Sequence, residues 1–176
     1  LKFPAGGLQN GEFSAVFWMN VNPDPNRAGI LVMGPEDADN AGYPDVQNLR
    51  SSGFRFFRED AGGLQRAKLN VGDGTADTWV DGGTDADIDP AATDWVHYAF
   101  TISGTEATVY IDGIAVKTST FSGIDWTGCD LLSIMSGVPR FTEWGHNSDL
   151  SLMDELRIFN KALSPSEIQT IINAES

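Results

Sequence analysis

Residues 95–118 read Trp-Val-His-Tyr-Ala-Phe-Thr-Ile-Ser-Gly-Thr-Glu-Ala-Thr-Val-Tyr-Ile-Asp-Gly-Ile-Ala-Val-Lys-Thr, which is the clearest structural signal in the chain. Aromatic and β-branched residues dominate the runs 95–103, 107–112 and 114–118, as is typical of strands. Between the last two runs, Asp112-Gly113 supplies residues that readily adopt the positive φ of a tight hairpin turn. The stretch therefore predicts a meander of three antiparallel strands.

The flanking sequence continues this pattern in both directions. Six further stretches predict strands: 12–20, 29–34, 54–58 and 66–71 before the meander, and 130–136 and 150–159 after it. The stretches 54–58 and 66–71 are joined as a hairpin across Gly62-Gly63. Residues 72–94 predict an ordered loop with one short strand. Only the tail predicts a helix, because Ser164 can cap it, Pro165 suits its first position and Glu167 completes a capping box. Many short strands with turn signals predict two packed antiparallel sheets.

The composition of the chain argues against two classes of binding partner, nucleic acids and membranes. The chain has 176 residues and a formal net charge of −14, so it should repel nucleic acid and anionic membranes. No apolar run approaches the ~18 residues of a membrane span, so membrane insertion is not expected. Cys129 is the single cysteine, which excludes an internal disulfide and a thiolate metal cluster. The lack of an Asn-x-Ser/Thr acceptor favours a bacterial source for a secreted protein.

Three stretches in order resemble the laminin-G-like branch of the concanavalin A-like lectin/glucanase superfamily. They are Phe-Ser-Ala-Val-Phe-Trp-Met at 13–19, Trp-Val-His-Tyr-Ala-Phe at 95–100 followed by Val-Tyr-Ile-Asp-Gly at 109–113, and the run from Leu152 to Ile168. The resemblance implies an all-β jelly-roll sandwich of two antiparallel sheets with one short C-terminal helix. We expect residues 1–176 to form a single domain of this kind, excised from a longer protein whose other domains are its neighbours.

Fold alone does not assign a function, because this superfamily includes lectins, laminin modules and glycanases. The Glu-x-Asp-x-x-Glu motif of similar glucanases and the Gln-Ile-His motif of similar lyases are both absent. A serine or cysteine nucleophile would need a histidine base, and only His97 and His146 are present. His97 lies where the family has a structural histidine, and Cys129 is expected to be a small buried residue. We therefore expect no enzymatic activity.

Aromatic residues outside the strand alternation are candidates for stacking on sugar rings, since an indole in a loop is either tucked inward or kept for a ligand. These candidates are Tyr43, Trp79, Trp126 and Trp144. Trp144 is favoured because Arg140, His146 and Asn147 could supply hydrogen bonds beside it. The alternative is that each ring anchors its own loop.

A basic strand offers a second binding hypothesis. Arg55 could grip a uronate or a sulfate group in bidentate fashion, together with Arg66 or Lys68 from the paired strand. The alternative is cross-strand pairing of these basic groups with Glu59 or Asp60.

A calcium site is the third hypothesis, because Asp154 lies between apolar neighbours in the sequence, where a carboxylate is costly unless it is paired or coordinated. In related glucanases, the aspartate that corresponds to Asp154 implies a structural Ca²⁺ ligand, and hard oxygen ligands suit calcium. A salt bridge to Arg157 or a lysine is the alternative. The acidic run 85–89 does not fit an EF-hand, because Pro90 replaces the required glycine, although a looser site with Asp73, Asp77 or Asp81 stays open.

These features together predict a non-catalytic carbohydrate-binding module of an extracellular or bacterial cell-surface protein, with a polysaccharide or oligosaccharide as partner. The first alternative is a laminin-G-type module for protein interaction or spacing, and the second is a glycanase.

Overall fold

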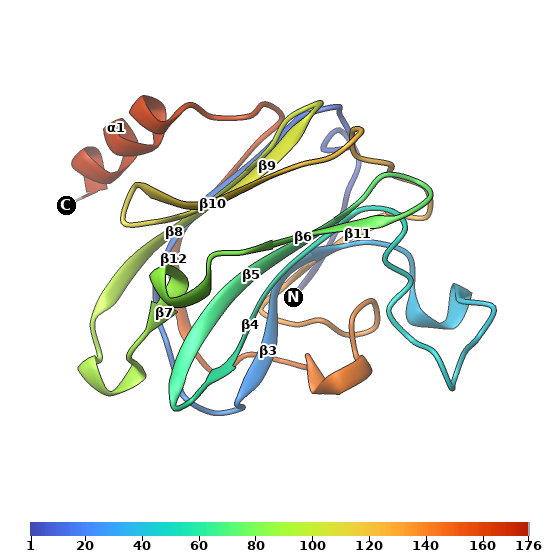
Figure 1. Cartoon of the computed structure of the whole chain (residues 1–176), viewed down its shortest axis with the longest axis horizontal. Helices are drawn as coiled ribbons and strands as arrows, with labels where there is room; N and C mark the ends of the chain where they lie inside the picture. The colour runs from blue at the N-terminus through green and yellow to red at the C-terminus, as the bar shows by residue number, and fades with distance from the viewer. Residues whose placement is uncertain (176) are drawn as a thin grey trace.

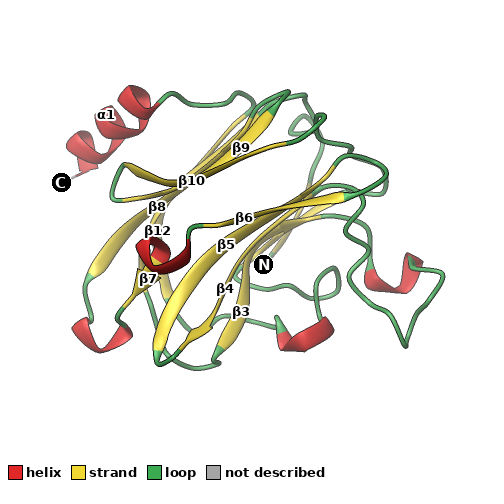
Figure 2. Cartoon of the chain, in the orientation of Figure 1, coloured by secondary structure: helices red, strands yellow, loops and turns green. Residues whose placement is uncertain are grey.

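The computed structural model describes residues 1–175, which form two antiparallel sheets packed face to face (Figures 1 and 2). The seven-stranded sheet has the order β1 (Lys2–Pro4), β11 (Leu131–Ile134), β3 (Arg27–Met33), β4 (Phe54–Ala61), β5 (Leu64–Gly72) and β6 (Asp77–Asp81), and β7 (Asp87–Ile88) also pairs with β5. The five-stranded sheet has the order β10 (Ile114–Thr120), β9 (Glu106–Ile111), β8 (Trp95–Ile102), β2 (Phe13–Asn20) and β12 (Leu152–Phe159). The predicted all-β sandwich is confirmed.

The predicted meander forms β8, β9 and β10. Thr101 of β8 lies opposite Thr108 of β9, and Ile111 lies opposite Ile114 across the turn. Asp112 and Gly113 have φ values of 48° and 78°, as a tight turn of this hand requires. Residues 72–94, for which one short strand was expected, contain β6 and β7 together with the 3-10 helices η2 (Gly83–Ala86) and η3 (Pro90–Ala92).

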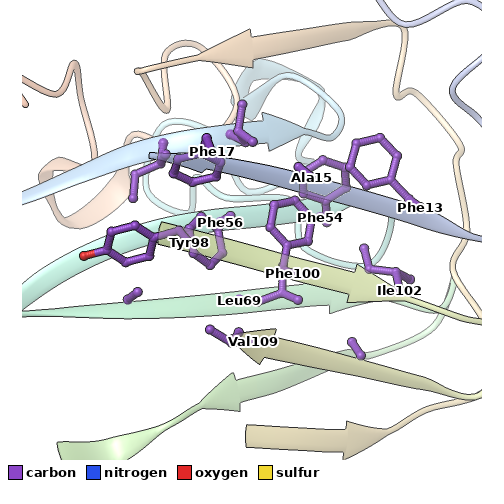
Figure 3. Packing of buried hydrophobic residues seen from close by; sticks show 14 of the residues in the cluster. Phe13, Ala15, Phe17, Phe54, Phe56, Leu69, Tyr98, Phe100, Ile102 and Val109 are labelled. Carbon is purple, nitrogen blue, oxygen red and sulfur yellow. The ribbon is translucent and has the colours of Figure 1, made fainter. Parts of the chain in front are cut away.

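Aromatic rings from both sheets fill the space between the layers (Figure 3). Strand alternation directs Phe13 and Phe17 of β2 inward, where they meet Phe56 of β4 and Phe100 of β8. The rings of Phe56 and Phe100 stack with centroids 4.9 Å apart. Burial of each such side chain contributes about 1.5–3 kcal/mol, so this cluster holds the two sheets together.

A buried ion pair closes one side of the core. Arg58 of β4 donates to both carboxylate oxygens of Asp149, at 2.7 and 2.8 Å, and to the carbonyl oxygen of Pro25 at 2.9 Å. Both side chains of the pair are almost completely buried. Each charge therefore depends on the other, since an unpaired buried ion is costly.

The helix α1 (Pro165–Glu175) covers part of the outer face of the five-stranded sheet. The predicted capping box is present, because Glu167 accepts the backbone N–H of Ser164 at 2.9 Å and Ser164 Oγ accepts that of Glu167 at 3.3 Å. Ile168 packs on Val16 and Ala99, which point outward from β2 and β8. No helix within residues 1–175 has the length and apolar character needed to cross a membrane.

Candidate ligand-binding surface

Side chains on the outer face of the seven-stranded sheet form three rows set by strand register. The first row across β4, β5 and β6 is Arg55, Asn70 and Trp79; the second is Phe57, Lys68 and Asp81; the third, across β4, β5 and β7, is Glu59, Arg66 and Asp87. The intervening residues of these strands enter the core, so strand alternation places all nine on one face. Trp79 thus lies on an edge strand and not in the loop in which the sequence placed it.

Two tryptophans flank an arginine above this face. The guanidinium carbon of Arg50 lies 5.5 Å from the ring centre of Trp79 and 5.3 Å from that of Trp144. Trp79 is 39% exposed and Trp144 is 48% exposed. Arg50 also pairs with Asp77 at 3.1 Å, which fixes the guanidinium between the rings. We call Arg50, Trp79 and Trp144 the Trp79–Trp144 surface.

The backbone at Trp144 adopts an uncommon conformation. Trp144 belongs to the 3-10 helix η4 (Glu143–Gly145) and has a φ of 64°, followed by Gly145 at 85°. A bulky residue rarely occupies this left-handed region, and the surroundings must hold it there. Arg27 does so by donating to the carbonyl oxygen of Trp144 at 3.1 Å, while Phe141 meets the indole edge to face. The loop therefore presents the indole despite a local conformational cost.

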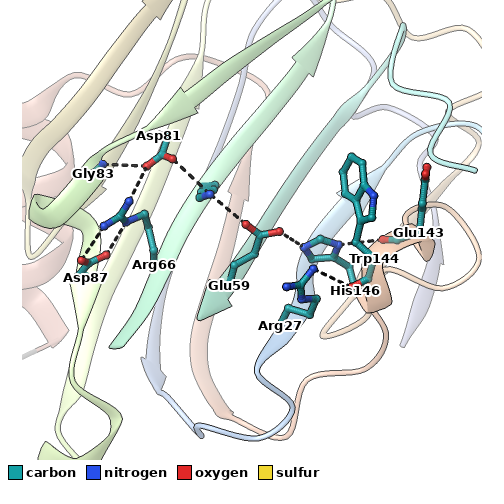
Figure 4. A network of polar contacts seen from close by, with 10 residues as sticks. Arg27, Glu59, Arg66, Asp81, Gly83, Asp87, Glu143, Trp144 and His146 are labelled. Carbon is teal, nitrogen blue, oxygen red and sulfur yellow. Dashed lines mark hydrogen bonds and ion pairs between the residues drawn. The ribbon is translucent and has the colours of Figure 1, made fainter. Parts of the chain in front are cut away.

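Basic side chains on this face are already paired with carboxylates (Figure 4). Arg66 makes a bidentate contact with Asp87 at 2.6 and 2.8 Å. Lys68 pairs with Glu59 at 3.0 Å and with Asp81 at 3.3 Å. The expected alternative of cross-strand pairing with Glu59 is thus present for Lys68, whereas Arg66 pairs with Asp87 instead of Glu59 or Asp60.

His146 is not available to a ligand, contrary to the prediction. Its side chain is fully buried beside Phe57 and Phe141, and its Nε2 lies 2.9 Å from a carboxylate oxygen of Glu59. The bond from His146, together with that from Lys68, lowers the pKa of Glu59 to about 2 although burial acts in the opposite direction. His146 therefore supports the loop beneath Trp144 from inside.

Arg140 is also buried and not at the surface, where it was predicted. It donates to the carbonyl oxygen of Gly34 at 2.5 Å and pairs with Asp130 at 3.0 Å, so it ties its loop to the sheet. Arg55 is fully buried as well, with its guanidinium bound to the carbonyl oxygens of Ser52 and Leu49. Burial lowers the pKa of Arg55 to about 10. This burial contradicts the prediction that Arg55 grips an anion at the surface.

The other predicted sugar-binding residues differ in how exposed they are. Asn147 and Tyr43 are exposed, and Tyr43 stands in the loop 35–52 as expected. Trp126 is half-buried, packs on Phe13 and Phe54, and donates from Nε1 to the carbonyl oxygen of Asn10 at 2.6 Å. For Trp126 the alternative of a loop anchor is therefore correct.

Asp154 does not lie in the environment from which calcium binding was predicted. Its carboxylate is exposed on the edge strand β12 and accepts the backbone N–H of Glu155 at 2.8 Å. Within residues 1–175, no three His, Cys, Asp or Glu side chains gather in a way that could hold a metal. Because the exposed carboxylate of Asp154 does not need a cation to offset burial of its charge, the calcium hypothesis stays a prediction.

Arg50 is the residue of this surface that sequence reasoning missed. It lies in the long polar loop before β4, where no periodicity marks a functional side chain. Only the meeting of that loop with β6 and η4 brings its guanidinium between the two indoles. The one available signal was its proximity in sequence to the strand that carries Arg55.

Comparison with known proteins extends these observations. A laminin G-type family model, described as the concanavalin A-like lectin/glucanases superfamily, matches residues 1–169. A search of curated proteins gives no match.

Among solved structures, domain 4 of the extracellular arabinanase AbnA from Geobacillus stearothermophilus, in complex with arabinotriose, is similar with a TM-score of 0.65 and 21% identity, over 97% of this chain and 70% of that one. Domains LG4-5 of the mouse laminin alpha1 chain give 0.62 and 11%, over 94% and 40%. The binding domain of botulinum neurotoxin DC, in complex with SialylT, gives 0.57 and 13%, over 96% and 37%. The chain thus spans less than half the length of two of these structures. Because the family model covers nearly the whole sequence, the chain belongs to the concanavalin A-like lectin/glucanase superfamily.

Proposed function

We propose that this chain is a non-catalytic carbohydrate-binding module of an extracellular or bacterial cell-surface protein, and that it holds a polysaccharide on the Trp79–Trp144 surface. The observation that carries the proposal is the pair of solvent-exposed indoles on either side of Arg50. Indoles stack on the apolar C–H faces of sugar rings, and a guanidinium between them can bond the hydroxyl groups. The complexes of similar domains with arabinotriose and SialylT agree with such a role.

The charges on this face favour an uncharged glycan. Arg66, Lys68 and Arg50 each have a carboxylate partner within 3.1 Å. An anionic sugar would have to displace these carboxylates or approach them, and the whole chain already carries a net charge of −14. A neutral polysaccharide neither displaces these carboxylates nor is repelled by them. Its hydroxyl groups can bond to both members of each ion pair.

The states of Glu59 and of the two histidines support a non-catalytic role. A glycosidase needs a carboxylic acid whose pKa is raised so that it can donate a proton at neutral pH. Glu59, the carboxylate held between His146 and Lys68, has its pKa lowered to about 2 and stays ionised. Both histidines of the chain have fully buried side chains, so neither can act as a base on an external substrate.

Binding measurements with matched tryptophan variants test this proposal. Isothermal titration with soluble arabinan, mixed-linkage β-glucan and polygalacturonate would compare the wild type with Trp144→Ala and Trp79→Ala. Loss of an aromatic contact of about 2 kcal/mol lowers affinity about 30-fold, and we expect at least 10-fold for each variant toward the neutral polymer that binds. Trp95→Ala is the control, because Trp95 is equally exposed but belongs to the other sheet.

Three outcomes would contradict the proposal. Binding of no glycan would favour the laminin-G-type protein-interaction module. Equal affinity in Trp144→Ala, Trp79→Ala and the wild type would show that a glycan lies elsewhere. Preference for polygalacturonate would refute the neutral-ligand argument while leaving carbohydrate binding intact.

A further inference from the structure

A second surface with exposed tryptophan lies on the outer face of the five-stranded sheet, on the opposite side of the core from the Trp79–Trp144 surface. It is a hollow of about 470 Å³ lined by Trp18, Trp95, Asp154, Glu155 and Glu175, and we call it the Trp18–Trp95 hollow. Its volume lies within the range of small-ligand sites. Strand register explains the grouping: Trp18 of β2 lies directly opposite Asp154 of β12, and Trp95 of β8 lies opposite Asn20, two residues along β2.

Two indoles form the aromatic part of the hollow. Trp95 is 45% exposed at the first position of β8. Trp18 is half-buried, and its Nε1 donates to a carboxylate oxygen of Glu175 at 2.8 Å. That bond fixes the orientation of the indole, and His97 packs against it edge to face with centroids 5.2 Å apart. The hollow thus offers one fixed ring and one exposed ring.

Negative charge in the hollow exceeds the positive charge that could balance it. Glu175 lies at the C-terminal end of α1, where the helix dipole already disfavours an anion, yet only 4% of its side chain is exposed. Arg157 pairs with Glu175 at 2.8 Å and reaches Glu155 at 3.4 Å. Asp154 bonds only a backbone N–H among the hydrogen bonds of this part of the chain. Of the three carboxylates that line the hollow, Arg157 therefore pairs with two, Glu155 and Glu175, and Asp154 has no cationic partner among the ion pairs of residues 1–175.

We propose that the Trp18–Trp95 hollow binds a small quaternary ammonium ion. Aromatic faces attract such cations through the ring quadrupole, most strongly when the ring is an indole. A quaternary ammonium has no N–H and is weakly hydrated, so it fits a site built from ring faces and from carboxylates that act at a distance. Metal ions fit less well, since no three side chains of the kind that bind metals converge within residues 1–175. A zwitterion would bring its own anion toward the carboxylates and is disfavoured.

Titration with choline and with its uncharged isostere, 3,3-dimethyl-1-butanol, tests the proposal. At constant ionic strength and neutral pH, we expect choline to change tryptophan fluorescence with saturation below about 100 mM, while the isostere does not saturate. Trp95→Ala should weaken choline binding at least 10-fold, and Asp154→Asn should weaken it by a smaller factor. Trp144→Ala is the control and should bind choline as the wild type does.

The result would overturn the proposal if choline failed to saturate, if the isostere bound equally well, or if Trp95→Ala kept the affinity of the wild type. Circular dichroism would establish that each variant is folded, which is expected because Trp95 and Asp154 are exposed. Failure of choline binding would leave the glycan proposal intact, because glycan titration of Trp144→Ala and Trp79→Ala, which alter the surface over the other sheet, tests that proposal separately.

Discussion

Replacement of His97 by glutamine should remove a large part of the acid sensitivity of the fold. The imidazole of His97 is fully buried on the outer side of β8, and within residues 1–175 neither of its ring nitrogens has a hydrogen-bond partner. Burial lowers the pKa of His97 to about 4, and the nearby charge of Asp112 only partly opposes this effect. In the unfolded chain the same group titrates near ~6.5.

The sign of the effect follows from these two values. Between pH 6.5 and 4 the unfolded chain binds a proton at His97 and the folded chain does not. The stabilisation from the neutral ring is complete above the unfolded pKa and is lost as the pH falls toward the folded pKa. The slope is at most about 1.4 kcal/mol per pH unit, and the loss between pH 7.5 and 4.5 is about 2.5 kcal/mol. Protonation of Glu59 also destabilises the fold in acid, but that loss lies mostly below about pH 4.5, between the pKa of an unfolded glutamate, about 4.3, and the folded pKa of about 2.

Urea unfolding at half-unit steps from pH 7.5 to pH 4.5 measures this effect. The free energy of unfolding of the wild type should fall about 2.5 kcal/mol further over this range than that of His97→Gln, whatever the stability of the variant at pH 7.5. Because both proteins contain the same other titratable groups, the contributions of those groups to the pH dependence cancel in this comparison. Parallel curves for the two proteins would refute the reasoning, because they would mean that His97 is protonated in the folded state or reaches solvent.

Three further predictions concern stability. Asp149→Asn should destabilise the fold by about 3–5 kcal/mol in urea unfolding, because Arg58 would keep its buried charge without a full partner. A loss below about 1 kcal/mol would contradict this and would mean that water reaches Arg58 and solvates its charge. Gly53→Ala should lower the melting temperature clearly more than Gly62→Ala, since both glycines have positive φ but only at Gly53 would a Cβ meet a backbone atom, the oxygen of Met33 at 1.9 Å. Asp154→Asn should leave the melting temperature unchanged with CaCl₂ and with a chelator, because Asp154 is exposed. A calcium-dependent rise in the melting temperature that this substitution abolishes would instead support the calcium hypothesis.

The strands, the two faces of each strand and the start of the helix could be predicted from the sequence, because each depends on the spacing of neighbouring residues. Alternation separated Phe13 and Phe17 from Trp18, and the Ser164–Glu167 capping box marked the start of α1. Such signals involve residues that are neighbours along one element, where geometry follows directly from periodicity.

The burial of polar site residues could not be inferred in the same way. Alternation places Arg55 and Phe57 on the same face of β4, but it does not indicate that the loops around Leu49 and Phe141 cover that face. The same loops enclose Arg140 and His146. A long-range loop contact leaves no periodic trace in the sequence, so an outward position was mistaken for an exposed one.

Asp154 illustrates a different failure. The run of apolar neighbours suggested a buried carboxylate, whose cost would require a metal or an ion pair. Strand β12 contains a register shift between Asp154 and Arg157, and Glu155 has a φ of 52°. This bulge interrupts the alternation that the prediction assumed, and an edge strand leaves the carboxylate in water.

The contrast among the tryptophans supports both proposed binding surfaces. Trp126 behaves as a structural indole should, since its ring packs on the core and its N–H has a carbonyl partner. Trp144 is 48% exposed and Trp95 is 45% exposed. If Trp144 only anchored its loop, burial of the ring would be favourable by about 25 cal/mol per Å² and the left-handed backbone conformation would bring no benefit. Exposure that is retained against both costs is expected of a ring that a ligand covers. The charges then distinguish the two ligands, because the ions around Trp144 are paired whereas carboxylates outnumber cations around Trp95.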